Sequence, residues 1–320
     1  MDKLEAKDIL DISRGFMPSR IYLTAAELDI FTLLIDTPMT ADETASMTDC
    51  QTRGITALLD ALTSMGLLLK KNAIYSVPDH LQPFLSSRTE TSLIPMAHHS
   101  SHMWNRWSQL SEIIRPKGAP QIDNMEAFIG AMHAIGYPLA EAIVQKVGVD
   151  DAKTLLDIGG ASGTYTMAFL RAFPALKVTL FDRPPVVELA RKRLGNAGLL
   201  DRVTLVTGDF SADPLPAGHD MALLSAIIHQ NDRKRNVDLY SNIHNALNPG
   251  GRIVIRDHVM SEDHTEPLSG AIFAINMLTG TPGGTFSFTE IKEDLEKAGF
   301  HDIRLLNPDT NMNGLVDART

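Results

Sequence analysis

Apolar positions along the chain follow two different periods, and the change between them falls near the middle. In the first part they recur at helical spacing, seen best in Ile55, Leu58, Leu59 and Leu62, which share one face of a helix. From Thr154 onward they form short runs separated by helix-length segments. This change predicts two domains, one mainly helical and one of the α/β class.

Local signals in the first part predict where helices begin and where the chain turns back. Thr40 and Glu43 have the spacing of a capping box, so a helix is predicted to start there. Two apolar runs, 67–69 and 74–77, surround a polar break and predict a hairpin. Helices followed by such a hairpin indicate a winged-helix-like domain, which we place at residues 1–92.

Residues 93–150 are predicted to form a helical linker, with helices near 93–114 and 124–147 around a break in which Pro116 and Pro120 flank Gly118. After it, the apolar runs lie at 154–158, 177–181, 203–207, 220–224 and 252–255, and two more, 301–306 and 312–317, suggest a closing hairpin. Strands that alternate with helices predict a doubly wound, Rossmann-like parallel sheet covered on both faces. We assign it to residues 151–320.

Composition and charge narrow the classes of partner. The 320 residues are 44% hydrophobic and 21% charged, typical of a globular protein, and no apolar stretch is long enough to span a membrane. The net charge of −10 disfavours nucleic acid and anionic lipid. The predicted winged helix carries seven acids against one Arg53 between residues 21 and 69, the opposite of a DNA-reading surface.

Cysteine and histidine usage argues against disulfides and metals. Cys50 is the only cysteine, so no intramolecular disulfide or thiolate-rich metal site is expected. His98, His99 and His102 have no carboxylate at ligand spacing, so no metal is assigned. The first residues lack the basic start and apolar stretch of a secretory signal, and a cytoplasmic protein is predicted.

The first predicted strand of the sheet ends in a glycine-rich turn. Asp157 precedes Gly159, Gly160 and Gly163, which let the backbone turn sharply and approach a ligand. Ala161 stands where a dinucleotide fingerprint has its second glycine, so a pyrophosphate ligand, and with it a nicotinamide dehydrogenase, is disfavoured.

The next two strands end in further polar groups. Asp182 follows the second strand, where an acid can accept both hydroxyls of a ribose. Gly208, Asp209 and Phe210 follow the third, suited to an adenine amine and its ring face. Since the carboxyl ends of parallel strands share one edge, the three strands together predict a site for a nucleoside-type cofactor.

These motifs resemble the class I S-adenosylmethionine-dependent O-methyltransferase family that includes the plant caffeate and the acetylserotonin types. The resemblance rests on the segments 156–163, 182–185, 208–210, 229–232, 247–251, 283–284 and 298–300, which occur in family order. It implies S-adenosylmethionine as cofactor, S-adenosylhomocysteine as product, an aromatic small-molecule acceptor, and a homodimer formed through the N-terminal domain. The implied cofactor-binding residues are Asp157, Gly159, Gly160, Gly163, Asp182, Arg183, Gly208, Asp209, Phe210 and Ser225.

The resemblance also implies the catalytic residues. His229 falls where family members carry the general base, and Asp257 matches an acid that orients it. Two departures weaken this transfer. Arg233 follows Asp232 where the family often has a second acid, and Phe286 lies in the segment where plant members place another orienting glutamate.

An acceptor pocket is expected from residues before the glycine turn and after the fifth strand of the sheet. The candidates are His102, Trp104, Trp107, Phe128, Met132, Phe273, Asn276 and Met277, of which the aromatic and methionine side chains suit a flat ring. Methionine and phenylalanine at helical spacing are equally typical of a plain core. Two further functions stay open at this point: methyl transfer to carbon or nitrogen, and a regulatory protein that senses the cofactor.

Overall fold

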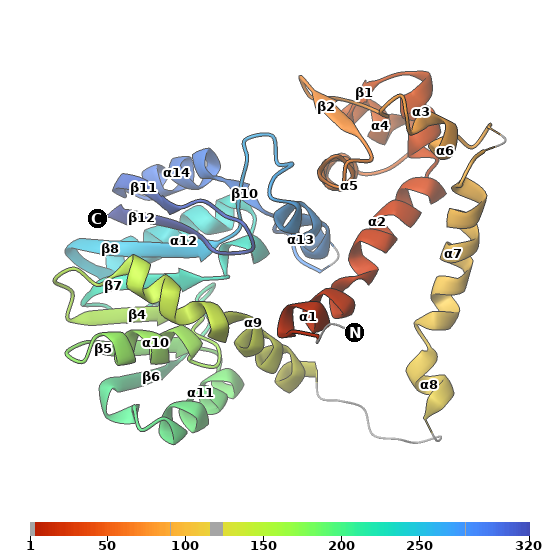
Figure 1. The fold of residues 1–320 in the computed structure, drawn as a ribbon. Coiled ribbons are helices and arrows are strands. Elements are labelled where there is room, and N and C mark those ends of the chain that lie inside the picture. The colour runs from red at the N-terminus through yellow and green to blue at the C-terminus, as the bar shows by residue number, and fades with distance from the viewer. Residues whose placement is uncertain (1–3, 90, 116–123, 279) are drawn as a thin grey trace. The chain divides into compact units, whose positions relative to one another are not determined.

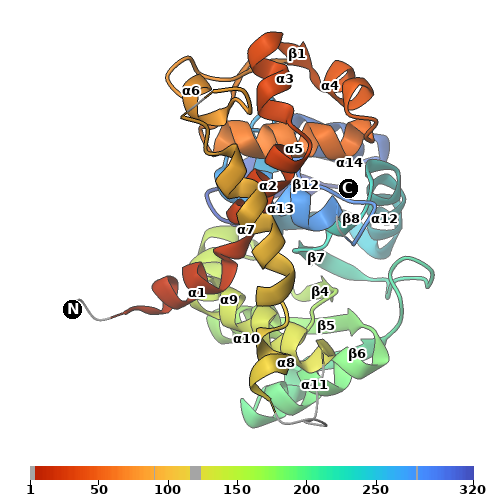
Figure 2. The same cartoon turned by 90° about the vertical axis from the view of Figure 1, so that its right-hand side faces the viewer.

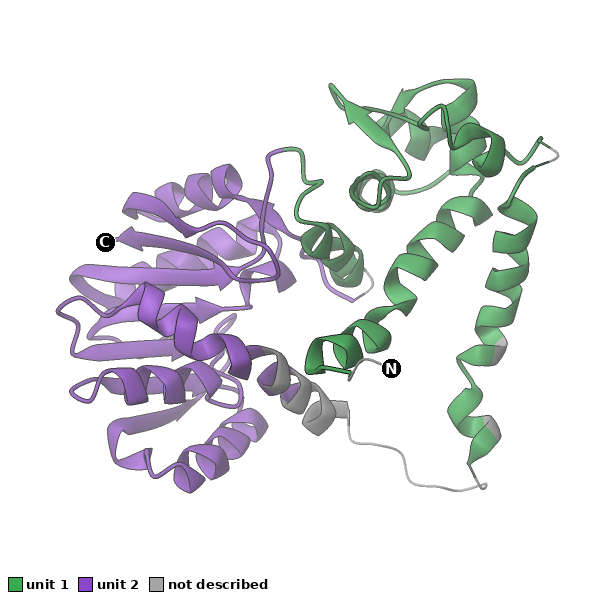
Figure 3. Ribbon diagram, in the orientation of Figure 1, with its two compact units in different colours: residues 1–120, 263–279 green, residues 121–262, 280–320 purple. Residues whose placement is uncertain are grey.

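The computed structural model describes residues 4–89, 91–115, 124–278 and 280–320. Its contacts divide the chain into two compact units (Figure 3). Unit 1 comprises residues 1–120 and 263–279, and unit 2 comprises residues 121–262 and 280–320. A short internal segment, residues 263–279, thus belongs with the N-terminal unit. The domain boundaries given above do not include this return, and they remain predictions.

Unit 1 is built from helices with one small sheet (Figure 1). Its helices are α1 (Ala6–Arg14), α2 (Phe16–Glu27), α3 (Ile30–Asp36), α4 (Ala41–Met47), α5 (Thr52–Ser64), α6 (Gln82–Leu85), α7 (Ile94–Trp107), α8 (Leu110–Ile114) and α13 (Leu268–Leu278). Strands β1 (Met39–Thr40), β2 (Leu69–Lys71) and β3 (Ile74–Ser76) form an antiparallel sheet in the order β1-β3-β2. The helix predicted at 93–114 is interrupted, because α7 ends at Trp107 and α8 begins at Leu110. The break predicted after it, in which Pro116 and Pro120 flank Gly118, lies outside the residues that the structure describes.

Local sequence signals set the start of α4 and the position of the hairpin. The Thr40 hydroxyl accepts from the Glu43 amide at 3.3 Å, and the Glu43 carboxylate accepts from the Thr40 amide at 2.8 Å, so the predicted capping box is confirmed. Under the hairpin, buried Asp60 accepts hydrogen bonds from Lys70 at 2.7 Å and Tyr75 at 2.6 Å. These bonds tie β2 and β3 to helix α5.

Unit 2 is an α/β domain around a seven-stranded sheet (Figures 1 and 2). The strands are β4 (Thr154–Ile158), β5 (Lys177–Asp182), β6 (Val203–Thr207), β7 (His219–Ser225), β8 (Leu247–Asp257), β11 (His301–Asn307) and β12 (Gly314–Arg319), in the order β11-β12-β8-β7-β4-β5-β6. β12 runs antiparallel to both neighbours, and the other pairs are parallel. The predicted strands and the closing hairpin are confirmed.

Helices cover both faces of this sheet because successive strand residues point to opposite sides. On one face, α9 (Asn124–Val147) and α10 (Thr164–Ala172) bury apolar side chains against residues such as Leu155 and Val254, and α11 (Pro184–Asn196) packs beside them. On the other face, α12 (Arg233–Ala246) and α14 (Phe288–Lys297) cover residues such as Ile253 and Ile255. The α/β fold class is therefore confirmed.

The order of strands reverses at the centre of the sheet. From β4 the chain adds β5 and β6 on one side, then crosses to β7 and β8 on the other. Ligands of such sheets bind beyond the carboxyl ends of the strands at this switch point. A parallel pair of short strands, β9 (Val259–Met260) and β10 (Phe286–Ser287), follows β8 at the same end. Within the described residues, no helix is long and apolar enough to cross a bilayer.

Candidate functional site

The glycine-rich turn after β4 is shaped by close packing. Gly159 has φ +66°, and an added Cβ would lie 2.5 Å from Ile227 Cδ1. Gly160 would place a Cβ 2.8 Å from Leu180 and 2.9 Å from the Asp157 carboxylate. Both positions therefore require glycine. Gly163, at φ +76°, is the residue from which α10 begins.

Asp182, predicted to bind a ribose, holds the glycine turn in place. Its Oδ2 accepts from the Ala161 amide at 2.9 Å, and its Oδ1 accepts from the Arg183 amide at 2.7 Å. Ala161 has φ +48°, a strained conformation for a residue with a side chain. Burial raises the pKa of Asp182, while these amide donors act to lower it. The carboxylate thus joins the ends of β4 and β5.

Asp157, the acid before the turn, is 1% exposed and accepts from the Thr166 hydroxyl at 2.5 Å. Burial raises the pKa of Asp157 to about 6, and the neighbouring Asp182 carboxylate adds to that rise. Two carboxylates that both resist ionisation lie beside the turn. A bound group with positive charge or hydrogen-bond donors would favour their ionised forms.

The three residues after β6 have different surroundings: Gly208 and Phe210 are in close packing, and Asp209 is exposed. Gly208 must be glycine, because an added Cβ would overlap the ring of Phe181. Phe210 lies by the glycine turn, 3.6 Å from a Cβ built on Gly159. Asp209 is exposed, and its Oδ1 accepts from the Ser211 hydroxyl and from the Ser211 amide at 2.9 Å, which together hold its pKa below the usual value. One oxygen of Asp209 is thus occupied by its own turn.

His229 and Asp257 lie together at the ends of neighbouring strands. His229 is in the 3₁₀ turn Ile228–Gln230 after β7, and Asp257 is the last residue of β8. The His229 Nδ1 lies 2.9 Å from Asp257 Oδ1 and 3.0 Å from Oδ2. Asp232, and not His229, is the N-cap of α12, accepting from the Arg235 amide at 2.8 Å.

The charge state of Asp257 follows from its partners. Complete burial acts to raise its pKa, but the His229 ring and the His258 amide, which donates at 2.8 Å, outweigh this and hold the pKa below the usual value. Asp257 is therefore a carboxylate at neutral pH. As an obligate acceptor, it selects the tautomer in which Nδ1 of His229 carries the proton and Nε2 is basic.

The two departures from the family pattern have structural partners. Arg233 reaches α14, where it pairs with Asp294 at 2.7 Å and Glu293 at 2.8 Å. Phe286 pairs in register with Val259 of β9. The segment around Phe286 instead supplies Ser287, whose hydroxyl donates to Glu262 at 3.0 Å.

The Gly-Gly pair contacts the backbone of His229. The Gly284 amide donates to the His229 carbonyl at 2.9 Å, and a Cβ on Gly283 would overlap that carbonyl. His229 is thus held through its side chain by Asp257 and through its backbone by the pair. The glycine pair in the sequence was the signal for this second contact.

The predicted acceptor residues are distributed over both units. In unit 1, His102 and Trp107 are exposed on α7, while Trp104 packs 6.4 Å from the ring of Phe16 and 5.7 Å from Arg20. On α13, Phe273 is half-buried, Asn276 is exposed and Met277 is buried. In unit 2, Met132 is exposed on α9, and the side chain of Phe128 lies outside the described residues. The pocket they were predicted to form remains a prediction.

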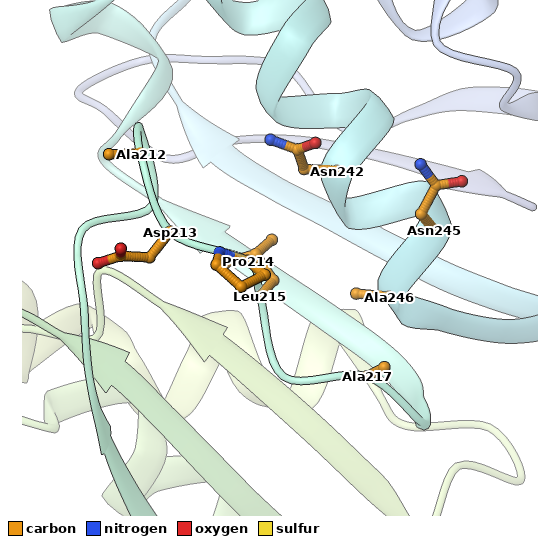
Figure 4. Close-up of a pocket in the computed structure, with 8 residues that line it drawn as sticks. All are labelled: Ala212, Asp213, Pro214, Leu215, Ala217, Asn242, Asn245 and Ala246. Atoms are coloured by element: carbon orange, nitrogen blue, oxygen red, sulfur yellow. The ribbon is translucent and has the colours of Figure 1, made fainter.

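A pocket in unit 2 is lined by none of these residues (Figure 4). Its lining includes Asp213 and Leu215, from the connection between β6 and β7, and Asn242 and Asn245, near the end of α12. Since α12 ends where β8 begins, this pocket is not at the carboxyl ends of the strands. It contains neither His229 nor the glycine turn.

Several polar residues beside the strand ends were not predicted from the sequence. Arg256 is 3% exposed and donates to the Ser225 hydroxyl at 3.2 Å, and its guanidinium lies 5.1 Å from the ring centroid of Tyr165. His258 Nδ1 lies 2.6 Å from Asp309. These contacts join positions far apart in the sequence, so no local pattern indicated them.

Comparisons with known proteins agree with this geometry. Residues 120–301 match the O-methyltransferase domain model, and residues 10–81 match the O-methyltransferase dimerisation domain model. A 3-hydroxy-5-methyl-1-naphthoate 3-O-methyltransferase of Streptomyces sahachiroi is 29% identical over 96% of this chain and 93% of its own. A mitomycin biosynthesis 6-O-methyltransferase of Streptomyces lavendulae is 30% identical over 92% of this chain and 89% of its own.

Solved structures support the same assignment. An O-methyltransferase family 2 protein of Planctomyces limnophilus, in complex with apigenin, has a TM-score of 0.85 at 23% identity and covers 100% of this chain and 97% of its own. At that identity it shows the fold alone. The mitomycin 7-O-methyltransferase MmcR has a TM-score of 0.59 at 26% identity, covering 98% and 97%. The domain model spans more than half of the chain, which therefore belongs to the family of S-adenosylmethionine-dependent O-methyltransferases.

Proposed function

We propose that this enzyme methylates a hydroxyl of an aromatic or polycyclic small molecule, with His229 as general base and Asp257 as its positioning residue. The observation that carries the proposal is the 2.9 Å contact of His229 Nδ1 with the carboxyl group of buried Asp257. The relatives of this chain, which include naphthoate, mitomycin and phenazine O-methyltransferases, support the class of acceptor.

The chemistry requires a positioned base. When bound, S-adenosylmethionine supplies a methyl carbon activated by its sulfonium. A phenol has a pKa of about 10 and a histidine one of about 6.5, so the proton leaves the hydroxyl as charge develops on the oxygen. With Nδ1–H donated to Asp257, the His229 Nε2 accepts that proton, and Asp257 stabilises the imidazolium that forms.

The described residues fit the cofactor. Asp182 and Phe210 offer the carboxylate and the ring for its nucleoside, next to a turn that Gly159 and Gly160 bring close to the site. Two buried polar atoms near the ends of β7 and β8, Tyr165 Oη and Arg256 Nε, have no hydrogen-bond partner among the described residues. Polar atoms buried in this way indicate a polar ligand.

The remaining cofactor residues are proposed on position. Asp157, Gly163, Arg183, Gly208, Asp209 and Ser225 belong to the same strand ends. The acceptor is proposed to contact His102, Trp104, Trp107, Phe128, Met132, Phe273, Asn276 and Met277. The dimerisation-domain match supports a homodimer formed through residues 10–81. A cytoplasmic location without nucleic-acid partners is proposed from the lone Cys50 and the net charge of −10.

The decisive experiment measures methyl transfer from labelled S-adenosylmethionine to a panel of phenols, naphthols and hydroxylated polycyclic compounds. We expect O-methylation of at least one, and a loss of about 10²–10⁴-fold in kcat for His229→Ala, with S-adenosylhomocysteine affinity unchanged. His301→Ala, an exposed histidine on β11, is the control and keeps full activity. Methylation at carbon, or unchanged turnover in His229→Ala, would contradict the proposal.

A further inference from the structure

Arg256 stands out as a buried cation that has no carboxylate partner among the described residues. It is 3% exposed, and among the described residues its guanidinium has no carboxylate partner, only the Ser225 hydroxyl at 3.2 Å and the ring of Tyr165. Its Nε has no hydrogen-bond partner there. Burying an unpaired charge costs several kcal/mol, so buried arginines are normally paired.

Arg252 shows what a satisfied arginine looks like on the same strand. It lies four residues earlier on β8 and points to the same face, where it is 5% exposed. Its Nε donates to Asp317 at 3.0 Å and its Nη1 to the Val147 carbonyl at 2.9 Å. One strand thus carries two buried arginines, and within the part of the chain that the structure describes, the one near its carboxyl end has no carboxylate partner.

Tyr165 adds a second donor at the same place. It is 8% exposed, and its hydroxyl has no hydrogen-bond partner among the described residues. Burial raises the pKa of Tyr165, the Arg256 charge acts to lower it, and the Asp157 charge acts to raise it, so the ring lies near both charges. The hydroxyl remains protonated at neutral pH and is a donor.

The position of this group relative to the glycine turn identifies its ligand. Ser225 and Arg256 are register partners at the carboxyl ends of β7 and β8, and β7 borders β4, which leads into the turn. Asp182 ends β5 on the other side of β4. From β5 to β8 is three strand spacings, about 14 Å, a span suited to an extended cofactor met by side chains at both ends.

S-adenosylmethionine has one anionic group, the carboxylate of its amino-acid tail, at the end opposite its adenosine. With the nucleoside at β5 and β6, that tail extends toward β7 and β8. We propose that Arg256, together with the Tyr165 hydroxyl and Ser225, forms the subsite for the carboxylate of the cofactor's amino-acid tail. The planar fork of arginine suits a carboxylate. Because Arg256 is buried, a hydrogen bond between its guanidinium and that carboxylate would be strong.

The test is calorimetric binding to the cofactor-free protein, with S-adenosylhomocysteine and with 5′-methylthioadenosine, which lacks the amino-acid tail. Arg256→Met is expected to weaken S-adenosylhomocysteine by about 10- to 100-fold and to leave 5′-methylthioadenosine unchanged. Arg256→Lys, which keeps the charge but not the fork, should lose less, and Tyr165→Phe less again. Arg252→Gln is the matched control and should alter neither affinity.

Thermal unfolding distinguishes a ligand-binding role of Arg256 from a structural one, because the two roles predict opposite changes in the melting temperature of Arg256→Met. Without ligand, Arg256→Met should keep or raise the melting temperature, because it removes a buried charge for which the described residues supply no carboxylate. Equal weakening of both nucleosides, or a large fall in the melting temperature, would overturn the assignment. Unchanged S-adenosylhomocysteine binding in Arg256→Met would also overturn it. If the KM of that variant were then raised only for acceptors that bear a carboxylate, the subsite would belong to the acceptor. Because the calorimetric measurement uses no acceptor, its result is independent of the proposed function.

Discussion

Two histidine–aspartate pairs flank the carboxyl end of β8, and they differ in access rather than in chemistry. His229 Nδ1 lies 2.9 Å from Asp257, with side chains 12% and 1% exposed. His258 Nδ1 lies 2.6 Å from Asp309, with side chains 3% and 0% exposed. In each, a carboxylate fixes one ring nitrogen. A base must also exchange its proton with substrate and solvent, so the pair with an accessible ring is the one suited to catalysis.

The largest effect that distinguishes the pairs is expected from replacing their acids. In Asp257→Asn the amide can donate as well as accept, so His229 loses the group that selects its tautomer, and kcat should fall by roughly 10²–10⁴-fold. Asp309→Asn, the matched change in the buried pair, should leave kcat nearly unchanged. Steady-state kinetics with saturating S-adenosylmethionine measures both. Similar losses in the two variants would remove the distinction.

Asp157 extends the comparison to a buried acid whose hydrogen-bond partner is the Thr166 hydroxyl and not an imidazole. Its pKa is raised to about 6 by burial, whereas the pKa of Asp257 is lowered. Because the folded chain holds the Asp157 proton more tightly than the unfolded chain, with its ordinary value of 3.8, stability is lost as pH rises from about 4 to 6. Asp157→Asn removes this loss, which is about 3 kcal/mol above pH 6 for a rise of this size.

Urea unfolding of the cofactor-free protein from pH 4 to pH 8 checks this prediction. The gain in stability of Asp157→Asn over the native chain should be near zero at pH 4 and reach its full value above pH 6. Asp257→Asn should show no such pH-dependent gain between pH 4 and pH 8, because the lowered folded pKa of Asp257 contributes stability that is present above the ordinary value of 3.8 and is lost only as pH falls further. A gain for Asp157→Asn that does not depend on pH would show that the effect is packing, not ionisation.

The smallest expected effect concerns the buried histidine. His258→Gln should lower the free energy of unfolding by about 1–3 kcal/mol, because it disturbs a buried hydrogen bond to Asp309. The kcat of the folded fraction should change little. His301→Gln, on an exposed side chain, should be neutral for both. A large fall in kcat for His258→Gln with full stability would place this histidine in the reaction.

The sequence predicted the features that depend on neighbours along the chain. The strand runs, the capping box at Thr40 and the glycine turn are set by the period of apolar residues and by backbone needs within a few positions. Asp209 shows the limit of such reasoning even locally. It was predicted to meet an adenine amine, and one of its oxygens is engaged by Ser211 two residues later.

Partners that are distant in sequence could not be predicted. Arg233 was interpreted only as a departure from a family pattern, and it forms ion pairs with acids about 60 residues away on α14. Arg256 followed an apolar strand without any signal that its side chain would be buried beside Tyr165. Such contacts are set by strand order and register, which the apolar pattern does not specify.

The return of residues 263–279 to unit 1 has a consequence for synthesis on the ribosome. Helix α5 packs against α13, with a Cβ on Gly54 lying 3.6 Å from Leu278. A nascent chain that has emerged only to residue 120 therefore lacks the helix that covers α5. The first unit to leave the tunnel is thus completed only when residue 279 has emerged, and the surface of α5 that α13 covers stays uncovered until translation is nearly finished.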